Sequence, residues 1–110
     1  MRQWEIHLFP FDREKPYPAV IISNDERCLN DDLDYVNALI CTSARVNREA
    51  KKNEVMLNGA DGLDRKTAVR CDVIYLLSKA EFKEQRGRVT PPRRVAIARK
   101  IAETLRLQMS

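Results

Sequence analysis

The amino-acid sequence predicts a mainly β fold with a C-terminal helix, in which a small, strongly curved antiparallel sheet or barrel is closed by that helix. Five to seven short apolar runs follow one another and are separated by polar segments rich in turn-forming residues. Only the last segment, from Pro91 onward, has the spacing of an amphipathic helix. The chain has 110 residues, enough for one modest core, so we expect a single domain over residues 1–110.

The N-terminal segment predicts two strands on either side of a proline-rich loop. Trp4, Ile6 and Leu8 alternate with polar residues, which is the period of a half-buried strand. Residues 9–18 hold three prolines and four charges. We expect a loop there, because proline lacks the N–H that a strand ladder needs. The apolar run at residues 19–23 predicts the next strand.

An acidic segment precedes the third and fourth predicted strands. Residues 24–34 carry five acidic side chains and are interpreted as a solvated loop or a frayed helical turn. Residues 35–42 (YVNALICT) predict a third strand, and residues 54–57 predict a short fourth one. The polar and basic residues 43–52 between them predict a connection along the surface.

The next segment predicts a turn followed by further strands. Residues 58–64 contain the dipeptides Asn-Gly and Asp-Gly, which are strong turn signals. Residues 67–77 predict one long strand or two consecutive strands, and Ser78 is a candidate cap for a single helical turn. Residues 86–90 predict a last short strand.

The C-terminal segment predicts a helix with one apolar side. Thr90 is a candidate N-cap and Pro91 suits the first helical position. Helical spacing then aligns a stripe that another surface must cover. Its members are Val95, Ala98, Ile101, Ala102 and Leu105.

The charge balance suits an anionic partner, although simple solubility is the common alternative. The formal net charge is +4. One basic cluster directly follows the third predicted strand and comprises Arg45, Arg48, Lys51 and Lys52. Seven more basic residues lie between Arg86 and Arg106, where a solvated helix face is the commoner explanation.

The cysteine and histidine pattern argues against a metal site. Cys28, Cys41 and Cys71 are widely spaced and His7 is the single histidine. We therefore expect neither a metal nor another cofactor. Cys41 and Cys71 lie in apolar runs and are expected to be buried thiols of a reducing compartment. With no signal-peptide pattern and no run of membrane-spanning length, the expected location is the cytoplasm, with no membrane partner.

Three segments, in this order, resemble the PemK/MazF toxin family. The first is the proline-rich loop followed by PAVIISND at residues 18–25, and the second is ALICTS at residues 38–43. The third is GLDRKTAVRCDVIYLLSKAEF at residues 62–82, followed by residues 87–107. Each segment alone is a weak signal, but the ordered set covers nearly the whole chain.

The resemblance implies a fold and a function. The fold is an SH3-like antiparallel barrel of the PemK/MazF/CcdB type that forms a homodimer. The function is that of the toxin of a toxin–antitoxin system, a metal-independent endoribonuclease that cleaves single-stranded messenger RNA. The implied partners are single-stranded RNA and a cognate antitoxin whose acidic tail blocks the RNA groove.

The family's catalytic groups transfer to this chain only in part. Thr42 matches a threonine that ends the third strand, although such a residue can simply end a strand. The family's catalytic arginine precedes the proline of the second strand, and here that position is Tyr17. Arg13 and Lys15, in the same loop, are the candidate substitutes, and Tyr17 itself could stack on a base. His7 is the last choice, because a lone strand histidine is usually a surface residue.

Five further residues are candidates for RNA binding. Thr67 and Asp72 match positions where the family contacts RNA, although Asp72 could equally be a solvated charge at a strand end. Ser43, Arg45 and Arg48 directly follow or lie near Thr42, where a phosphate-binding rim would belong.

Three alternatives to the nuclease stay open. A catalytically degenerate RNA-binding member of the same fold is favoured by Tyr17 in place of arginine. A CcdB-type gyrase inhibitor is disfavoured, because that activity relies on a C-terminal Trp-Gly-Ile whereas this chain ends LRLQMS. The last alternative is a small basic domain with another role.

Overall fold

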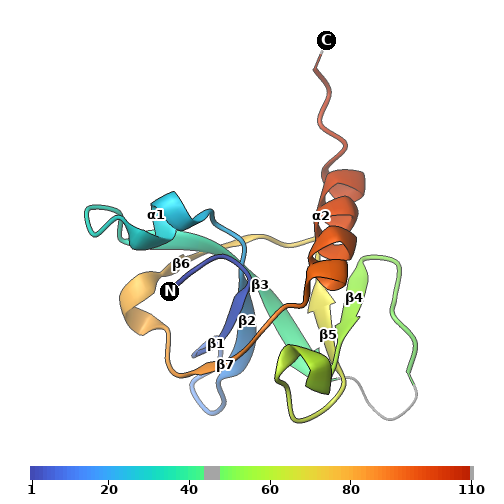
Figure 1. The fold of residues 1–110 in the computed structure, drawn as a ribbon, viewed down its shortest axis with the longest axis horizontal. Helices are drawn as coiled ribbons and strands as arrows, with labels where there is room; N and C mark the ends of the chain where they lie inside the picture. The colour runs from blue at the N-terminus through green and yellow to red at the C-terminus, as the bar shows by residue number, and fades with distance from the viewer. Residues whose placement is uncertain (44–47, 110) are drawn as a thin grey trace.

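The computed structural model describes residues 1–43 and 48–109. Within them, seven strands form one curled antiparallel sheet, a half-barrel in the order β4-β5-β3-β2-β1-β7, with β6 paired to β3 (Figure 1). The strands are β1 (Glu5–Phe9), β2 (Tyr17–Ile21), β3 (Tyr35–Ser43), β4 (Glu54–Leu57), β5 (Thr67–Arg70), β6 (Tyr75–Ser78) and β7 (Gln85–Arg88). The helices are α1 (Asp25–Leu29) and α2 (Pro91–Leu105), with short 3-10 turns η1 (Gly59–Asp61) and η2 (Lys79–Glu81). The predicted fold class, mainly β with a C-terminal helix, is confirmed.

Most of the predicted elements are confirmed, with shifts at their ends. The second strand begins at Tyr17 and contains Pro18, so the loop is shorter than expected. Pro18 is tolerated because β3 pairs with β2 only from Ala19 to Ile21, which leaves no ladder bond for the missing N–H to make there. The acidic segment forms the one-turn helix α1, which Asn24 caps by accepting from the Arg27 N–H.

Strand β3 joins the two parts of the sheet. Its first half pairs with β2 on one edge and with β6 on the other, whereas Cys41–Ser43 pair with β5. Because successive strand residues point to opposite faces, Cys41 and its partner Val69 face the main core. Thr42 and its partner Ala68 face the other side.

The main core lies between the concave sheet and α2. Its fully buried members include Ile6, Val20, Leu39, Val69 and Ile97. Cys41 and Cys71 are free and buried, as predicted. Burial raises the pKa of Cys71 to about 11 and raises that of Cys41 further, so both are inert thiols at neutral pH.

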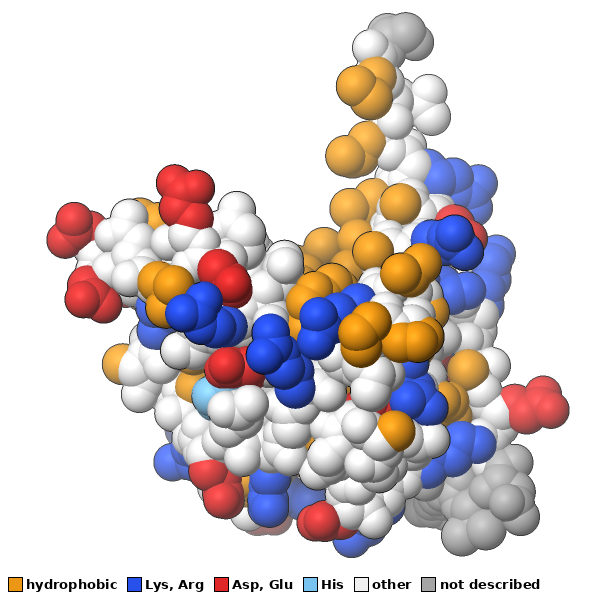
Figure 2. Space-filling view, in the orientation of Figure 1, with side chains coloured by type: hydrophobic (Ala, Val, Ile, Leu, Met, Phe, Trp, Pro, Cys, Tyr) orange, Lys and Arg blue, Asp and Glu red, His pale blue; other side chains and the backbone are white. Residues whose placement is uncertain are grey.

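Of the predicted apolar stripe of α2, only Ile101 packs against this core, and the other four members are exposed. Val95 is 50% exposed and Leu105 is 48% exposed, whereas Ile97 is fully buried and Ile101 packs at its margin. Figure 2 shows apolar side chains gathered at the surface along one side of α2. The helix carries two apolar faces, and polar anchoring at its first turn sets which of them faces inward.

That anchor is the buried carboxylate of Asp61. Its Oδ1 accepts from the Thr90 N–H at 2.9 Å, and its Oδ2 lies 3.2 Å from the Arg93 guanidinium. Arg93 also donates to the Met56 carbonyl in β4. The Thr90 side chain makes no cap bond, so Asp61 replaces the predicted cap by accepting from the Thr90 backbone.

The predicted turn at residues 58–64 is also confirmed, in the form of η1. Asn58 and Asp61 form a reciprocal capping box around it, and Gly62 follows with φ of +89°, a conformation that favours glycine. By contrast, Ser78 makes no side-chain cap bond at the start of η2. Among the residues that the structure describes, no helix has the length and apolar character needed to cross a membrane.

Candidate functional site

The candidate residues at the end of β3 divide between two clefts. Thr42 and Ser43 are neighbours in one strand, so their side chains point to opposite faces of the sheet. Thr42 lines one cleft and Ser43 lines the other. The structure therefore separates two residues that the sequence places side by side.

The Thr42 cleft has a volume of about 550 Å³ and lies where β3, β4 and β5 meet. It brings together three predicted site residues from separate segments. Its lining residues are Thr42, Arg48, Lys51, Lys52, Asn53, Glu54, Arg70 and Asp72. Four of these are cationic and two are acidic, so the cleft is basic on balance.

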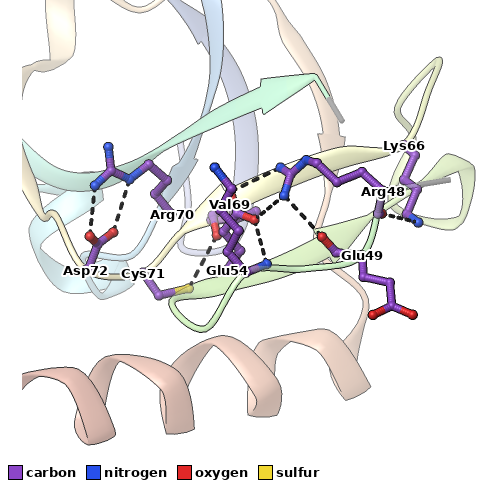
Figure 3. Close-up of polar contacts among 9 residues, drawn as sticks. Arg48, Glu49, Glu54, Lys66, Val69, Arg70, Cys71 and Asp72 are labelled. Atoms are coloured by element: carbon purple, nitrogen blue, oxygen red, sulfur yellow. Dashed lines mark hydrogen bonds and ion pairs between the residues drawn. The ribbon is translucent and has the colours of Figure 1, made fainter. Parts of the chain in front are cut away.

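Arg48 does not present a free charge to this cleft. Its guanidinium binds the Glu54 carboxylate with two bonds of 2.7 and 3.2 Å (Figure 3). Glu54 also accepts from the Lys51 N–H at 2.8 Å. The hydrogen bond from Arg48 lowers the pKa of Glu54, so the pair stays ionised at neutral pH. An RNA phosphate would have to compete with Glu54 for Arg48.

Asp72 is likewise paired, with Arg70 at the end of β5. Arg70 Nε lies 3.2 Å from one Asp72 oxygen, and a terminal guanidinium nitrogen lies 2.8 Å from the other (Figure 3). The Arg70 hydrogen bond lowers the pKa of Asp72, and that same bond raises the pKa of Arg70. The carboxylate predicted to contact RNA thus faces an arginine, and it holds that arginine in a fixed orientation.

The second cleft, which we call the Ser43 cleft, has a volume of about 410 Å³ and opens beside η1. It collects Lys15 and Thr67 together with further basic and polar residues. Its lining is Leu8, Lys15, Pro18, Ser43, Gly62, Leu63, Asp64, Arg65, Thr67, Gln85 and Arg86. Thr67 is only 4% exposed, and its hydroxyl donates to the Arg65 carbonyl, so little of it faces this cleft.

Tyr17, Lys15 and Arg13 are absent from the lining of the Thr42 cleft. The β2–β3 ladder ends at the pair Ala19–Ile40. If the same register continued by two residues, Tyr17 would lie opposite Thr42. The Lys15 ammonium lies 5.8 Å from the centre of the Tyr17 ring, a cation–π contact. Arg13 is exposed in the β1–β2 loop and lines neither of the two clefts.

His7 already has partners at both ring nitrogens. Nε2 lies 2.8 Å from the Glu5 carboxylate and Nδ1 lies 3.2 Å from the Lys83 carbonyl. The ring also packs edge-on against Phe82. These contacts give His7 a structural role, and its side chain is only 13% exposed, so it is not the surface residue that the sequence favoured. The predicted RNA contact Arg45 lies outside the described residues.

Sequence reasoning missed Arg70, the exposed arginine that lines the same cleft as Thr42. The signal was present, because Arg70 and Asp72 are two residues apart and alternate residues of an extended segment share a face. What the spacing could not reveal is the pairing of β5 with β3, which brings the ion pair next to Thr42.

Comparisons with known proteins agree on the family. The family model described as a PemK-like, MazF-like toxin of type II toxin–antitoxin systems matches residues 2–105. Among curated proteins, no sequence matches this chain significantly.

Solved structures resemble the whole fold. An endoribonuclease in complex with its cognate antitoxin, from a mycobacterial species, has a TM-score of 0.82 at 24% identity, covering 100% of this chain and 99% of that chain. A further mycobacterial endoribonuclease has a TM-score of 0.78 at 25% identity, covering 100% and 95%. The MazE–MazF structure from Deinococcus radiodurans has a TM-score of 0.77 at 17% identity, covering 98% and 97%. With a family match over almost its full length, this chain belongs to the PemK-like, MazF-like toxins of type II toxin–antitoxin systems.

Proposed function

We propose that this toxin is an endoribonuclease that cleaves single-stranded messenger RNA without a metal ion or other cofactor. The observation that carries the proposal is Thr42, whose face of β3 lines a basic cleft. The family match and the endoribonucleases among the structural neighbours support it. A cleft with four cationic side chains suits a chain of phosphates.

The reaction needs a hydrogen-bond donor and positive charge beside the phosphate that is cleaved. The ribose 2′-hydroxyl gives its proton to water as its oxygen attacks the adjacent phosphorus, and the bond from phosphorus to the 5′-oxygen breaks as that oxygen takes a proton from water. The products are a 2′,3′-cyclic phosphate and a free 5′-hydroxyl. Negative charge grows on the phosphorane oxygens, where a hydroxyl such as that of Thr42 can donate a hydrogen bond and a guanidinium can supply charge.

The test is cleavage of a long single-stranded RNA by the purified chain in EDTA, with the new ends mapped. We expect discrete cuts that carry cyclic-phosphate ends. Thr42→Ala should slow cleavage by about 10²-fold or more, the usual loss when a transition-state donor is removed. Thr104→Ala removes the same atoms from α2, outside both clefts described above, and should cleave at the parent rate. If Thr42→Ala cleaves as fast as the parent, the active site lies elsewhere.

A catalytically degenerate RNA-binding toxin is the second candidate, and Tyr17 is the observation that favours it. The family position for a catalytic arginine carries a phenol here, beside a lysine in cation–π contact. In that case the chain binds RNA with an affinity that falls as salt rises, and the RNA stays intact. The same assay, read by gel shift as well as by cleavage, separates the two candidates.

The proposed protein partners are a cognate antitoxin and a second copy of this chain. Two of the structural neighbours are toxin–antitoxin complexes, which supports the antitoxin. An acidic antitoxin tail would suit the basic clefts. The exposed apolar stripe on α2 supports a homodimer, because such a surface favours burial against a partner.

We also propose that residues 1–110 act as one domain in the cytoplasm. The three cysteines are free and buried, which suits a reducing compartment. Messenger RNA, the proposed substrate, is present there as well.

A further inference from the structure

We infer that Arg70 is the catalytic guanidinium of this toxin and that Asp72 positions it, in place of the arginine that Tyr17 replaces. This inference rests on the proposed nuclease function and identifies the cation that it requires. It departs from the sequence-based candidates Arg13 and Lys15, which belong to the β1–β2 loop.

The strand register places Arg70 near Thr42. Thr42 of β3 pairs with Ala68 of β5, so their side chains share a face. Arg70 follows Ala68 by two residues and returns to that face. In an antiparallel pair such diagonal neighbours have Cβ atoms roughly 7–8 Å apart, within reach of a long side chain. Arg70 and Thr42 accordingly line one cleft.

The Arg70 guanidinium has a fixed orientation. Asp72 holds Arg70 by two hydrogen bonds, of 3.2 and 2.8 Å, from Nε and one terminal nitrogen. A guanidinium has five N–H donors, so donors remain for a phosphate. The Arg70 side chain is 47% exposed and therefore accessible to RNA. A guanidinium that is fixed in orientation and accessible can donate hydrogen bonds to the oxygens of a phosphorane.

Arg48 and Lys15 are less suited to this role than Arg70. Arg48 is bound to Glu54, whose side chain is 8% exposed, so its charge is already compensated in a more enclosed pair. Lys15 lines the Ser43 cleft and lies over Tyr17. Of the two described arginines in the Thr42 cleft, Arg70 has the more accessible side chain, 47% against 28%.

The proposed step cleaves one phosphodiester bond of the RNA. The 2′-oxygen forms a bond to phosphorus and gives its proton to solvent water. The bond from phosphorus to the 5′-oxygen breaks, and that oxygen leaves with the electron pair and takes a proton from solvent water. Arg70 donates to the non-bridging oxygens while their charge is largest, and Asp72 keeps the guanidinium aimed at them.

The experiment is single-turnover cleavage of a long single-stranded RNA in EDTA by the full chain and its variants, with RNA affinity measured beside it. Arg70→Ala should cleave about 10²–10³-fold more slowly than the parent. Arg70→Lys keeps the positive charge but loses the planar guanidinium, so its cleavage rate should lie between those of the parent and Arg70→Ala. Arg99→Ala removes an exposed arginine from α2 and should leave the rate unchanged.

Chemical rescue distinguishes a catalytic role from a structural one. Free guanidinium, at concentrations that leave the fold intact by circular dichroism, should restore part of the rate of Arg70→Ala and none of the rate of Thr42→Ala. Asp72→Asn should lower the cleavage rate more than it lowers RNA affinity, because the Arg70 guanidinium loses its fixed orientation but keeps its charge.

Each remaining outcome is decisive. If the parent cleaves and Arg70→Ala stays within about threefold of it, the proposed function stands and the assignment of Arg70 is wrong. A larger loss for Lys15→Ala than for Arg70→Ala would assign the role to Lys15. If the parent binds RNA without cleaving it, the nuclease function and the catalytic role of Arg70 both fall.

Discussion

At the scale of single residues, Gly87 packs closely against the backbone of Asp61 and Gly62. A Cβ built on Gly87 in β7 would lie 2.0 Å from the Asp61 carbonyl oxygen and 3.1 Å from Gly62 Cα. Both neighbours are backbone atoms, so they cannot rotate away. This contact fixes η1, and hence one wall of the Ser43 cleft, against β7.

Gly87→Ala is therefore expected to destabilise the fold by about 1–3 kcal/mol or more, the usual cost of overpacking. The measurement is the free energy of unfolding from urea denaturation. Gly59→Ala is the matched control, because a Cβ there meets nothing within 4 Å, and its effect should stay within about 0.5 kcal/mol. Equal stability of the two variants would mean that the close approach of β7 to η1 is wrong.

At the scale of elements, α2 works as a helix with two apolar faces. Ile97 and Ile101 lie one turn apart and face the sheet, and Asp61 and Arg93 hold the helix in that rotation. Val95 and Leu105 lie on the face that the structure leaves exposed. The inner face supports the fold, and the outer face is the surface that the proposed homodimer would cover.

Substitutions on the two faces should have different effects. Ile97→Ala opens a cavity in the core and should lower the free energy of unfolding by about 2–5 kcal/mol. Val95→Lys should change the stability of the monomer little and should shift the chain toward monomer in sedimentation experiments. Val95→Ala serves as the mild control. A dimer that survives Val95→Lys unchanged would contradict an interface on this face of α2.

At the scale of the whole molecule, paired carboxylates make the free energy of unfolding depend on pH in the acidic range. Hydrogen bonds from Arg48 and from Arg70 lower the pKa values of Glu54 and Asp72 respectively. The Gln3 N–H similarly lowers the pKa of Asp25. Because the folded state favours the ionised forms, their contribution is complete above the unfolded pKa values and is lost as pH falls through the lower folded values.

We expect the free energy of unfolding to be flat near neutral pH and to fall below about pH 4.5. Each of these pairs has at least one partner accessible to solvent, which screens the interaction, so the decline should be gradual. Glu54→Gln should flatten part of the decline, whereas Glu14→Gln, in the exposed β1–β2 loop, should not. The measurement is urea denaturation across pH 2–8. A parent and a Glu54→Gln variant with identical acid profiles would show that the Arg48–Glu54 pair contributes nothing.

Much of the fold follows from local pattern. The alternation of Trp4, Ile6 and Leu8 predicted β1, and the Thr90-Pro91 start predicted α2, because period and capping are properties of neighbouring residues. The buried thiols of Cys41 and Cys71 followed from the apolar runs around them. The ordered segments also carried the family resemblance that the match over residues 2–105 bears out.

The surroundings of the candidate site were less predictable. Ser43 and Thr42 are adjacent in sequence, yet strand geometry turns them to opposite faces and into different clefts. The sequence did not indicate Arg70 as a candidate, because its position near Thr42 depends on pairing between β3 and β5, whose residues are far apart in the chain. That Arg70 lies near Thr42 can be inferred only when the register of β3 and β5 is known.

The sequence by itself determined which segments are strands, which is the helix and to which family the chain belongs, since these depend on short-range periodicity and on ordered motifs. Only the tertiary structure decided which side of α2 faces the core and that Arg70 shares a cleft with Thr42. Both depend on long-range contacts, the Asp61–Arg93 pair and the β3–β5 register, and no local pattern encodes the distance between segments that meet only on folding.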